Sequence, residues 1–273
     1  MRVPALNAWF PLALLFSTLN LQLSTAFAQG SLTPPGAPAP TFKTLDQVKP
    51  GTAITSVPFT ITNSGYFYLT RSFNNSTTAI FIGSDDVSLD LGGFTLTGDG
   101  GVNDHGVRVG LTGNDGQSRV TIRNGTVRNF GSGVFIGQLS SSVLVEDFLA
   151  YGCSAGFQIA STAASGPRLC TVRHCYAVSN TSAGILIGGP VAGLSAENLI
   201  VDCVAQGNQT GIQIASTNNL VIRNLSFGNA GGDYSISPNN RSGAIIAPAV
   251  NTVTSTISSP GSGTTDPFAN LRY

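Results

Sequence analysis

The chain has 273 residues, of which 10% are Asp, Glu, Lys or Arg, against roughly a quarter in ordinary soluble domains. Thirteen basic and thirteen acidic side chains cancel, and no segment is rich in Lys or Arg, which argues against nucleic acid or an anionic membrane as a partner. With 33 Gly and 41% hydrophobic residues but only two Lys and two Glu, the composition favours an all-β solenoid or barrel over a helical protein.

The first 28 residues carry the features of a secretory signal peptide. An apolar run over residues 9–23 is followed by Ala26-Phe27-Ala28, the small-x-small pattern that signal peptidase reads. Pro11 and Asn20 interrupt the run, which falls short of the ~20 apolar residues of a membrane-spanning helix. We therefore expect cleavage after residue 28, secretion to the cell surface, periplasm or medium, and no transmembrane segment after cleavage.

Residues 29–41 are Pro-rich and lack apolar periodicity, which predicts an extended linker. A folded domain is expected over residues 42–250, as a succession of short β-type runs separated by Gly, Asn and Ser. Residues 42–78 have alternating β character and suit an N-terminal cap that covers the open end of a solenoid. The Ser/Thr/Gly-rich tail, residues 251–273, ends in apolar residues that suit packing against the domain.

Repeats run through this domain. A Gly followed by an apolar-x-apolar run recurs at intervals of 27, 23, 28 and 27 residues, at Gly106, Gly133, Gly156, Gly184 and Gly211. A second β-type run follows in each repeat, and alignment of these runs puts polar residues in one column: Asp90, Asn124, Asp147, His174, Asp202 and Asn224. Because Asn and Asp tolerate a left-handed backbone, this column predicts a tight turn in every repeat.

Short strands with tight turns, repeated about every 26 residues, predict a parallel β-helix. Each coil stacks on the previous one at about 4.8 Å, so that inward Val, Ile, Leu and Phe form continuous columns. The repeat intervals predict about seven coils, with the right-handed winding expected of parallel crossovers.

Two stretches resemble the right-handed parallel β-helix proteins of the pectate-lyase-like superfamily. FTITNSGYFYL (59–69) looks like the entry segment of secreted bacterial members, and VSLDLGGFTLTG (87–98) looks like their first full coil. The resemblance covers roughly residues 52–248 and implies the fold. It says little about activity, because the superfamily holds lyases, hydrolases, epimerases, esterases and proteins with no assigned chemistry.

In enzymatic members, the resemblance places catalysis on the outer face of the first strand of each coil. Strand alternation identifies the outward residues there as Phe81, Arg108, Phe135, Gln158, Leu186 and Gln213. These weak candidates for ligand binding include no carboxylate, whereas a calcium-dependent lyase needs several and a hydrolase needs an acid and a base. We therefore assign no catalytic residue, and lean towards a protein that is not an enzyme.

The loop with Asp99, Asp104 and His105 is open to two interpretations, a carboxylate-histidine site or a hydrophilic Gly-rich turn, and the second is preferred. Cys175 and Cys203 occupy equivalent positions one coil apart, where they predict either a disulfide or stacked buried thiols. No spacing resembles a metal site, and no cofactor is expected.

Three functional hypotheses remain. The first is a secreted, non-catalytic β-helix that serves as a structural or carbohydrate-associating module for a polysaccharide or surface glycan. The second is a small polysaccharide lyase, hydrolase or epimerase with loop-borne catalytic residues. The third is a self-assembling surface protein, with Phe81, Phe135 and Leu186 as an apolar stripe that another chain covers.

Overall fold

A computed structural model describes residues 51–110, 116–160, 165–188, 195–246 and 266–272. The expected signal peptide, the linker and residues 251–265 of the tail lie outside the described residues. All the described residues belong to one compact unit, which extends over 49–273.

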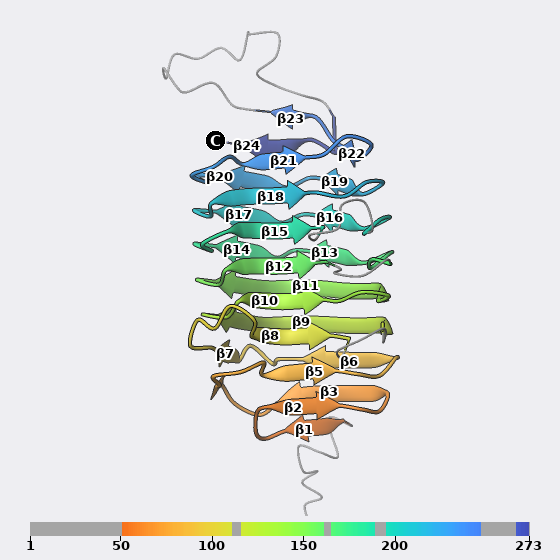
Figure 1. Cartoon of the computed structure of the whole chain (residues 1–273), viewed down its shortest axis with the longest axis vertical. Coiled ribbons are helices and arrows are strands. Elements are labelled where there is room, and N and C mark those ends of the chain that lie inside the picture. The colour runs from red at the N-terminus through yellow and green to blue at the C-terminus, as the bar shows by residue number, and fades with distance from the viewer. Residues whose placement is uncertain (1–50, 111–115, 161–164, 189–194, 247–265, 273) are drawn as a thin grey trace, which may run out of the picture. The chain divides into compact units, whose positions relative to one another are not determined.

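The described residues form 24 strands and no helix, in two sheets (Figure 1). The eight-stranded sheet contains, in order, β2 (Phe59–Ile61), β5 (Ile80–Ile82), β8 (His105–Val109), β10 (Ser132–Ile136), β12 (Ala155–Ile159), β15 (Ala183–Ile187), β18 (Thr210–Ile214) and β21 (Tyr234–Ile236). The larger, 16-stranded sheet contains β1 (Thr52–Ile54), β3 (Gly65–Leu69), β4 (Phe73–Asn74), β6 (Val87–Asp90), β7 (Thr95–Thr97), β9 (Ser118–Arg128), β11 (Ser141–Tyr151), β13 (Thr171–Arg173), β14 (Tyr176–Val178), β16 (Leu199–Val201), β17 (Val204–Gln206), β19 (Leu220–Ile222), β20 (Leu225–Phe227), β22 (Arg241–Ser242), β23 (Ile245–Ile246) and β24 (Asn270–Arg272).

The strands pair in parallel from one coil to the next, which confirms the predicted right-handed parallel β-helix of about seven coils. Each coil contributes one strand to the eight-stranded sheet and then crosses the larger sheet, where the chain bends halfway. In β9 and β11 the bend lies within one long strand, and in later coils it separates two short strands such as β13 and β14.

The core lies inside the coils and is built from columns of aliphatic and aromatic side chains. One column of the eight-stranded sheet is at most 1% exposed along its length: Ile80, Val107, Val134, Phe157, Ile185 and Ile212. Each such side chain stabilises the fold by roughly 1.5–3 kcal/mol through burial. The apolar-x-apolar runs of the sequence supply these columns.

The repeated Gly at the start of each run has a packing reason. A Cβ on Gly106 would lie 2.6 Å from the carbonyl oxygen of Gly133, and Gly133, Gly156 and Gly184 face the Gly of the following coil in the same way. Because real Cβ atoms do not approach an oxygen this closely, any larger residue would push the coils apart at this corner. The glycine column therefore permits the close stacking of successive coils.

Buried Asn side chains form ladders that link the last coils at three corners. In one ladder, Asn208 accepts hydrogen bonds from the backbone N–H and the side-chain amide of Asn180, both 2.9 Å long, and donates to Asn229 at 3.0 Å. The second ladder runs through Asn198, Asn219 and Asn240, and the third through Asn224 and Asn270. These amides satisfy backbone N–H groups at bends where regular strand pairing is interrupted.

Each Asn ladder starts at the backbone N–H of a cysteine: Cys153, Cys170 and Cys203. The pairing on either side of Cys203 places it opposite Cys175 in the coil before. The four cysteines are buried free thiols. Burial raises the pKa of the Cys153 thiol to about 11 and that of the Cys170 thiol to about 12.

The described strands at both ends of the domain extend the parallel stack. In the segment expected to be an N-terminal cap, β1 pairs in parallel with β3, and β2 with β5, so the described part continues the stack. At the other end, β24 pairs with β20 and β23, and Asn270 is fully buried as the last residue of the third Asn ladder. Residues 266–272 of the tail thus pack on the domain.

We predict that Asn208→Ala lowers the free energy of unfolding by about 2 kcal/mol or more, because the buried N–H of Asn180 loses its acceptor. Gln206→Ala, at an exposed position two residues earlier, is the control and should change it by less than about 0.5 kcal/mol. Urea unfolding followed by circular dichroism measures both. Equal effects of the two substitutions would contradict a stabilising role for the ladder.

The buried thiols should react slowly in the folded protein. At pH 8, a thiol of pKa 11 is ionised in only about one molecule in a thousand, and the thiolate is the reactive form. A chromogenic disulfide reagent should therefore detect almost no thiol until guanidinium is added, and then four per chain. Rapid modification of one thiol without denaturant would show that a cysteine is accessible.

Candidate functional site

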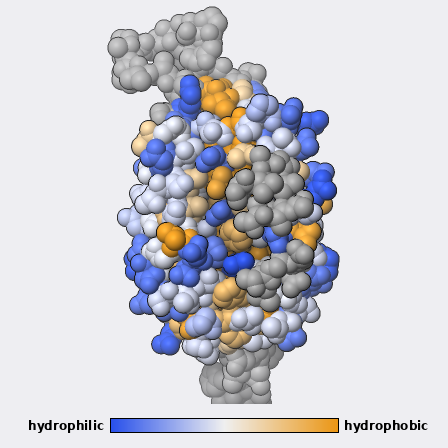
Figure 2. Space-filling view, in the orientation of Figure 1, coloured by the Kyte–Doolittle hydropathy of each residue, from blue (hydrophilic) through white to orange (hydrophobic). Residues whose placement is uncertain are grey.

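The outward residues of the eight-stranded sheet form one column that crosses six coils. The register pairs each with the next: Phe81 with Arg108, Arg108 with Phe135, Phe135 with Gln158, Gln158 with Leu186, and Leu186 with Gln213. All six are half-buried. This sheet faces the viewer in Figure 1, and Figure 2 shows on the same side an interrupted band of apolar residues along the stack.

Phe135 is the centre of the best-defined cluster on this face. The ring of His105 stacks on it, with centroids 4.7 Å apart and an interplanar angle of 22°. The guanidinium carbon of Arg108 lies 5.4 Å from the centroid of the same ring. His105 and Arg108 both come from β8, one coil before Phe135, so the strand stacking itself assembles the three side chains.

His105 is 8% exposed, and no described group hydrogen-bonds its buried Nδ1. Burial, reinforced by the nearby Arg108 charge, lowers the pKa of His105 to about 4, so its imidazole is neutral at pH 7. The Arg108 Nε donates a 3.1 Å hydrogen bond to the Gly110 carbonyl, and among the described residues no carboxylate forms an ion pair with Arg108. Partial burial lowers the pKa of this guanidinium below its usual value.

Polar groups from β10 and β12 lie beside Phe135. Ser132 is 3% exposed, and its hydroxyl donates a 2.6 Å hydrogen bond to the Gln158 side-chain oxygen. The sequence analysis did not identify Ser132. A signal was present, since Ser132 precedes the repeat residue Gly133 just as His105 precedes Gly106 one coil earlier. The position before the repeat Gly thus lies beside the outward column.

The loop residues Asp99, Asp104 and His105 separate in the structure. Both carboxylates lie next to Gly101, and Asp99 accepts a 3.1 Å hydrogen bond from the Gly101 N–H. Asp99 also borders a polar hollow of about 490 Å³ with Arg128. His105 instead joins the cluster around Phe135. In the described residues the two carboxylates therefore belong to a turn, whereas the histidine lies on the face of a strand.

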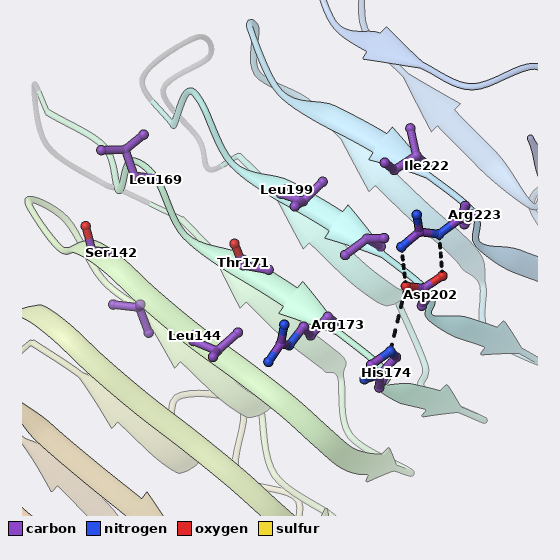
Figure 3. Close-up of a pocket in the computed structure, with 12 residues that line it drawn as sticks. Ser142, Leu144, Leu169, Thr171, Arg173, His174, Leu199, Asp202, Ile222 and Arg223 are labelled. Carbon is purple, nitrogen blue, oxygen red and sulfur yellow. Dashed lines mark hydrogen bonds and ion pairs between the residues drawn. The ribbon is translucent and has the colours of Figure 1, made fainter. Parts of the chain in front are cut away.

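The larger sheet carries an open groove of about 660 Å³ on its outer side (Figure 3). We call it the aliphatic groove, after the side chains that line it from β11 to β19: Leu144, Leu169, Leu199, Val201 and Ile222. Arg173, His174, Asp202 and Arg223 border it where the chain bends between the two halves of the sheet.

Ion pairs between coils follow this bend. Arg223 donates hydrogen bonds of 2.7 and 2.6 Å to Asp202, which lower the pKa of that carboxyl. The two ring nitrogens of His174 each lie 3.7 Å from a carboxylate oxygen, Nδ1 from Asp147 and Nε2 from Asp202. One coil earlier, Arg173 donates a 2.8 Å hydrogen bond to Glu146. The charged groups at the bend thus stabilise the stack of coils.

The predicted turn column is correct at four positions and shifted at two. Asn124, Asp147, His174 and Asp202 have the expected left-handed backbone, with φ between 50° and 59°. In the next coil Arg223 takes this conformation (φ 56°), and Asn224 points inward to the third Asn ladder.

Asp90 is shifted in the opposite direction: it lies one position early, opposite Arg123, and its coil turns at Gly92 and Gly93. Asp90 accepts hydrogen bonds from the Gly92 N–H (2.7 Å) and the Asn124 amide (3.2 Å), and so holds the turn from beside it. In both shifted cases the side-chain amide or carboxylate is used for a hydrogen bond, which competes with its preference for the left-handed position.

Among the described residues, no cluster of three or more His, Cys, Asp or Glu side chains is arranged to hold a metal ion. The same part of the chain contains no helix that is both long and apolar enough to cross a membrane.

Comparison with known proteins gives one match. A family model described as "Right handed beta helix region" matches residues 61–227, which is more than half of the chain. No curated protein and no solved structure matches the chain significantly.

The His105 environment predicts a stability that depends on pH. The folded state lowers the pKa of His105 from 6.5 to about 4, so it favours the neutral imidazole. The contribution of this preference to the free energy of unfolding is complete above pH 6.5 and is lost as the pH falls towards 4. The free energy of unfolding should decrease by up to about 3 kcal/mol over this window.

Urea unfolding at several pH values tests this prediction. His105→Phe keeps an aromatic ring on Phe135 and removes the titrating group, so the decrease between pH 6.5 and 5 should flatten. His174→Asn, at the exposed bend, is the matched control and should retain the decrease. A wild-type profile that is flat over this range would refute the assignment.

Proposed function

Because the chain belongs to the right-handed β-helix family, we propose that it is an exported, non-catalytic glycan-binding protein whose ligand lies along the outer face of the eight-stranded sheet. The observation that carries the proposal is the cluster of His105, Arg108 and Phe135 within a column of in-register outward side chains. The signal-peptide pattern of residues 1–28 supports export.

The composition of the column suits a chain of sugar rings. Phe81 and Phe135 offer aromatic surface, and Gln158 and Gln213 offer amides that both donate and accept hydrogen bonds. Parallel pairing repeats these groups at about 4.8 Å on rigid strands, so that they are positioned before a ligand binds. An extended polymer therefore contacts several coils at once.

The groups around Phe135 favour a neutral or weakly charged ligand. Arg108 is the one charged side chain among the six column residues, and its guanidinium N–H groups can donate hydrogen bonds to sugar oxygens. The neutral His105 adds a polar group that does not attract anions at pH 7. Gln158, held by Ser132, fixes one amide in a defined orientation.

Acid–base cleavage of a polysaccharide needs at least two ionisable groups held on one substrate. The six-residue column contains no carboxylate, and the described carboxylates of Asp99 and Asp104 lie against Gly101. This arrangement favours binding over hydrolysis or elimination.

A glycan array followed by calorimetry on the best ligand tests the proposal. We expect Phe135→Ala and Arg108→Ala each to weaken binding about tenfold or more, which corresponds to about 1.4 kcal/mol for the loss of one contact. Tyr151→Ala is the matched control, because this exposed aromatic residue lies on the larger sheet and should leave the affinity unchanged.

Incubation with pectin, alginate and neutral polysaccharides addresses the enzymatic alternative. Unsaturated products are followed by ultraviolet absorbance and new reducing ends by a colour assay. Turnover that is abolished by His105→Phe would contradict a non-catalytic role. An array with no bound glycan would reject the proposed ligand class.

A further inference from the structure

Among the described residues, the most exposed large hydrophobic side chains belong mainly to the larger sheet. Seven of its large hydrophobic side chains are at least 38% exposed and lie in its strands or in the turns that lead into them: Leu139, Tyr151, Leu169, Tyr176, Leu220, Ile245 and Phe268. The eight-stranded sheet has no large hydrophobic side chain exposed to this degree. Several large apolar side chains exposed on one sheet are a feature of protein interfaces.

The aliphatic groove continues along this sheet in both directions. Ile222 lines it and also a second hollow of about 330 Å³ that reaches Phe268. His174 lines it and also a third hollow of about 370 Å³, across the bend, that contains Leu149 and Tyr176. The groove and these two hollows thus form one surface over the outer side of the larger sheet.

The chemistry of this surface differs from that of the eight-stranded sheet. Its floor is aliphatic, without the column of aromatic and amide groups that suits a sugar chain. The charged groups at its centre are already paired within the chain, as Arg223 with Asp202 and Arg173 with Glu146. An aliphatic floor with paired charges is the composition of a protein–protein interface.

The order of charges along the bend identifies the partner. From β11 to β19 the successive coils carry, at the same position of the bend, Asp147, His174, Asp202 and Arg223. A two-fold axis between the second and third of these coils places Asp147 opposite Arg223, and the His174 imidazole opposite the Asp202 carboxylate. The pattern is complementary to itself when two copies run antiparallel.

The outward apolar residues of the larger sheet also match each other under this two-fold symmetry. One outward column of the sheet reads Leu144, Thr171, Leu199 and Leu220, and the other reads Leu149, Tyr176, Val204 and Leu225. The two-fold axis sets the first residue of each column on the fourth and the second on the third. Every one of these contacts is apolar except for the hydroxyl groups of Thr171 and Tyr176. A parallel arrangement would instead set like charges against each other.

We propose that the outer face of the larger sheet is the interface of an antiparallel homodimer, in which a second copy of this chain covers the aliphatic groove. The eight-stranded sheets then face away from each other, and the glycan-binding face assigned above stays open in both copies. The dimer presents two such faces, which increases avidity for a polymeric ligand. The interface does not depend on the ligand proposal, because it involves different residues.

Sedimentation velocity of the purified chain over a range of concentrations tests the dimer. The wild-type protein should show a reversible monomer–dimer equilibrium. The double substitution Leu169→Glu with Tyr176→Glu should raise the dimer dissociation constant at least tenfold, because it places charges in the apolar contact at sites that are 58% and 53% exposed. Val102→Glu, 77% exposed outside this face, is the control and should leave the equilibrium unchanged.

A charge exchange tests the antiparallel arrangement. Asp202→Arg combined with Arg223→Asp keeps an ion pair within the chain but sets like charges against the second copy, so the dimer should be lost while the circular dichroism spectrum is retained. A wild-type monomer at all concentrations, or a dimer that survives both double substitutions, would overturn the proposal. Glycan titration of the same variants separates the two functions, since loss of the dimer should leave the affinity of a single site for a short glycan unchanged.

Discussion

The parallel stacking of each coil on the one before it is the constraint on which this structure depends. Backbone hydrogen bonds in the strands run from coil to coil, so every coil must repeat the path of its neighbour closely. At the corners the chain bends, so its backbone N–H groups lose their regular partners in the neighbouring coil. Asn ladders, such as the one through Asn180 and Asn208, supply acceptors at these corners and hold the register. The glycine column allows the coils to approach closely enough for this pairing.

Stacking also brings equivalent residues of successive coils together into continuous surfaces. A residue in one coil lies next to its equivalent in the following coil, so Arg108 meets Phe135 although 27 positions separate them in the chain. The eight-stranded sheet thereby collects aromatic, amide and guanidinium groups, and the larger sheet collects Leu, Val, Ile and Tyr around a row of paired charges. The two faces share one scaffold and differ in chemistry, so the proposed ligand binding and the proposed self-association involve separate sides.

The turn residues show the limits of predicting backbone conformation from the preference of a single residue type. Asn was expected at the left-handed position after β19, but Arg223 occupies it and Asn224 is buried. The carboxamide of Asn224 accepts a hydrogen bond from the Cys203 N–H and donates to Asn270 inside the coil, and Arg223 gains an ion pair with Asp202 outside it. Both interactions depend on neighbouring coils, so the conformational preference of a single residue cannot reveal them. The same reasoning explains the position of Asp90 beside its turn.

The sequence by itself determined the all-β class, the coil repeat, the right-handed parallel β-helix and the outward positions of the first strand in each coil. It did so because the alternation of apolar residues reports directly which side chains point inward, and the repeated Gly marks the start of each run. Only the tertiary structure decided that His105 leaves its acidic loop neighbours to stack on Phe135, and that Leu169 and Ile222 share a groove. The physical reason is that these contacts join side chains from different coils. Their distances depend on how the coils superimpose and on the direction that each side chain takes, and neither quantity is encoded in the periodicity of one segment.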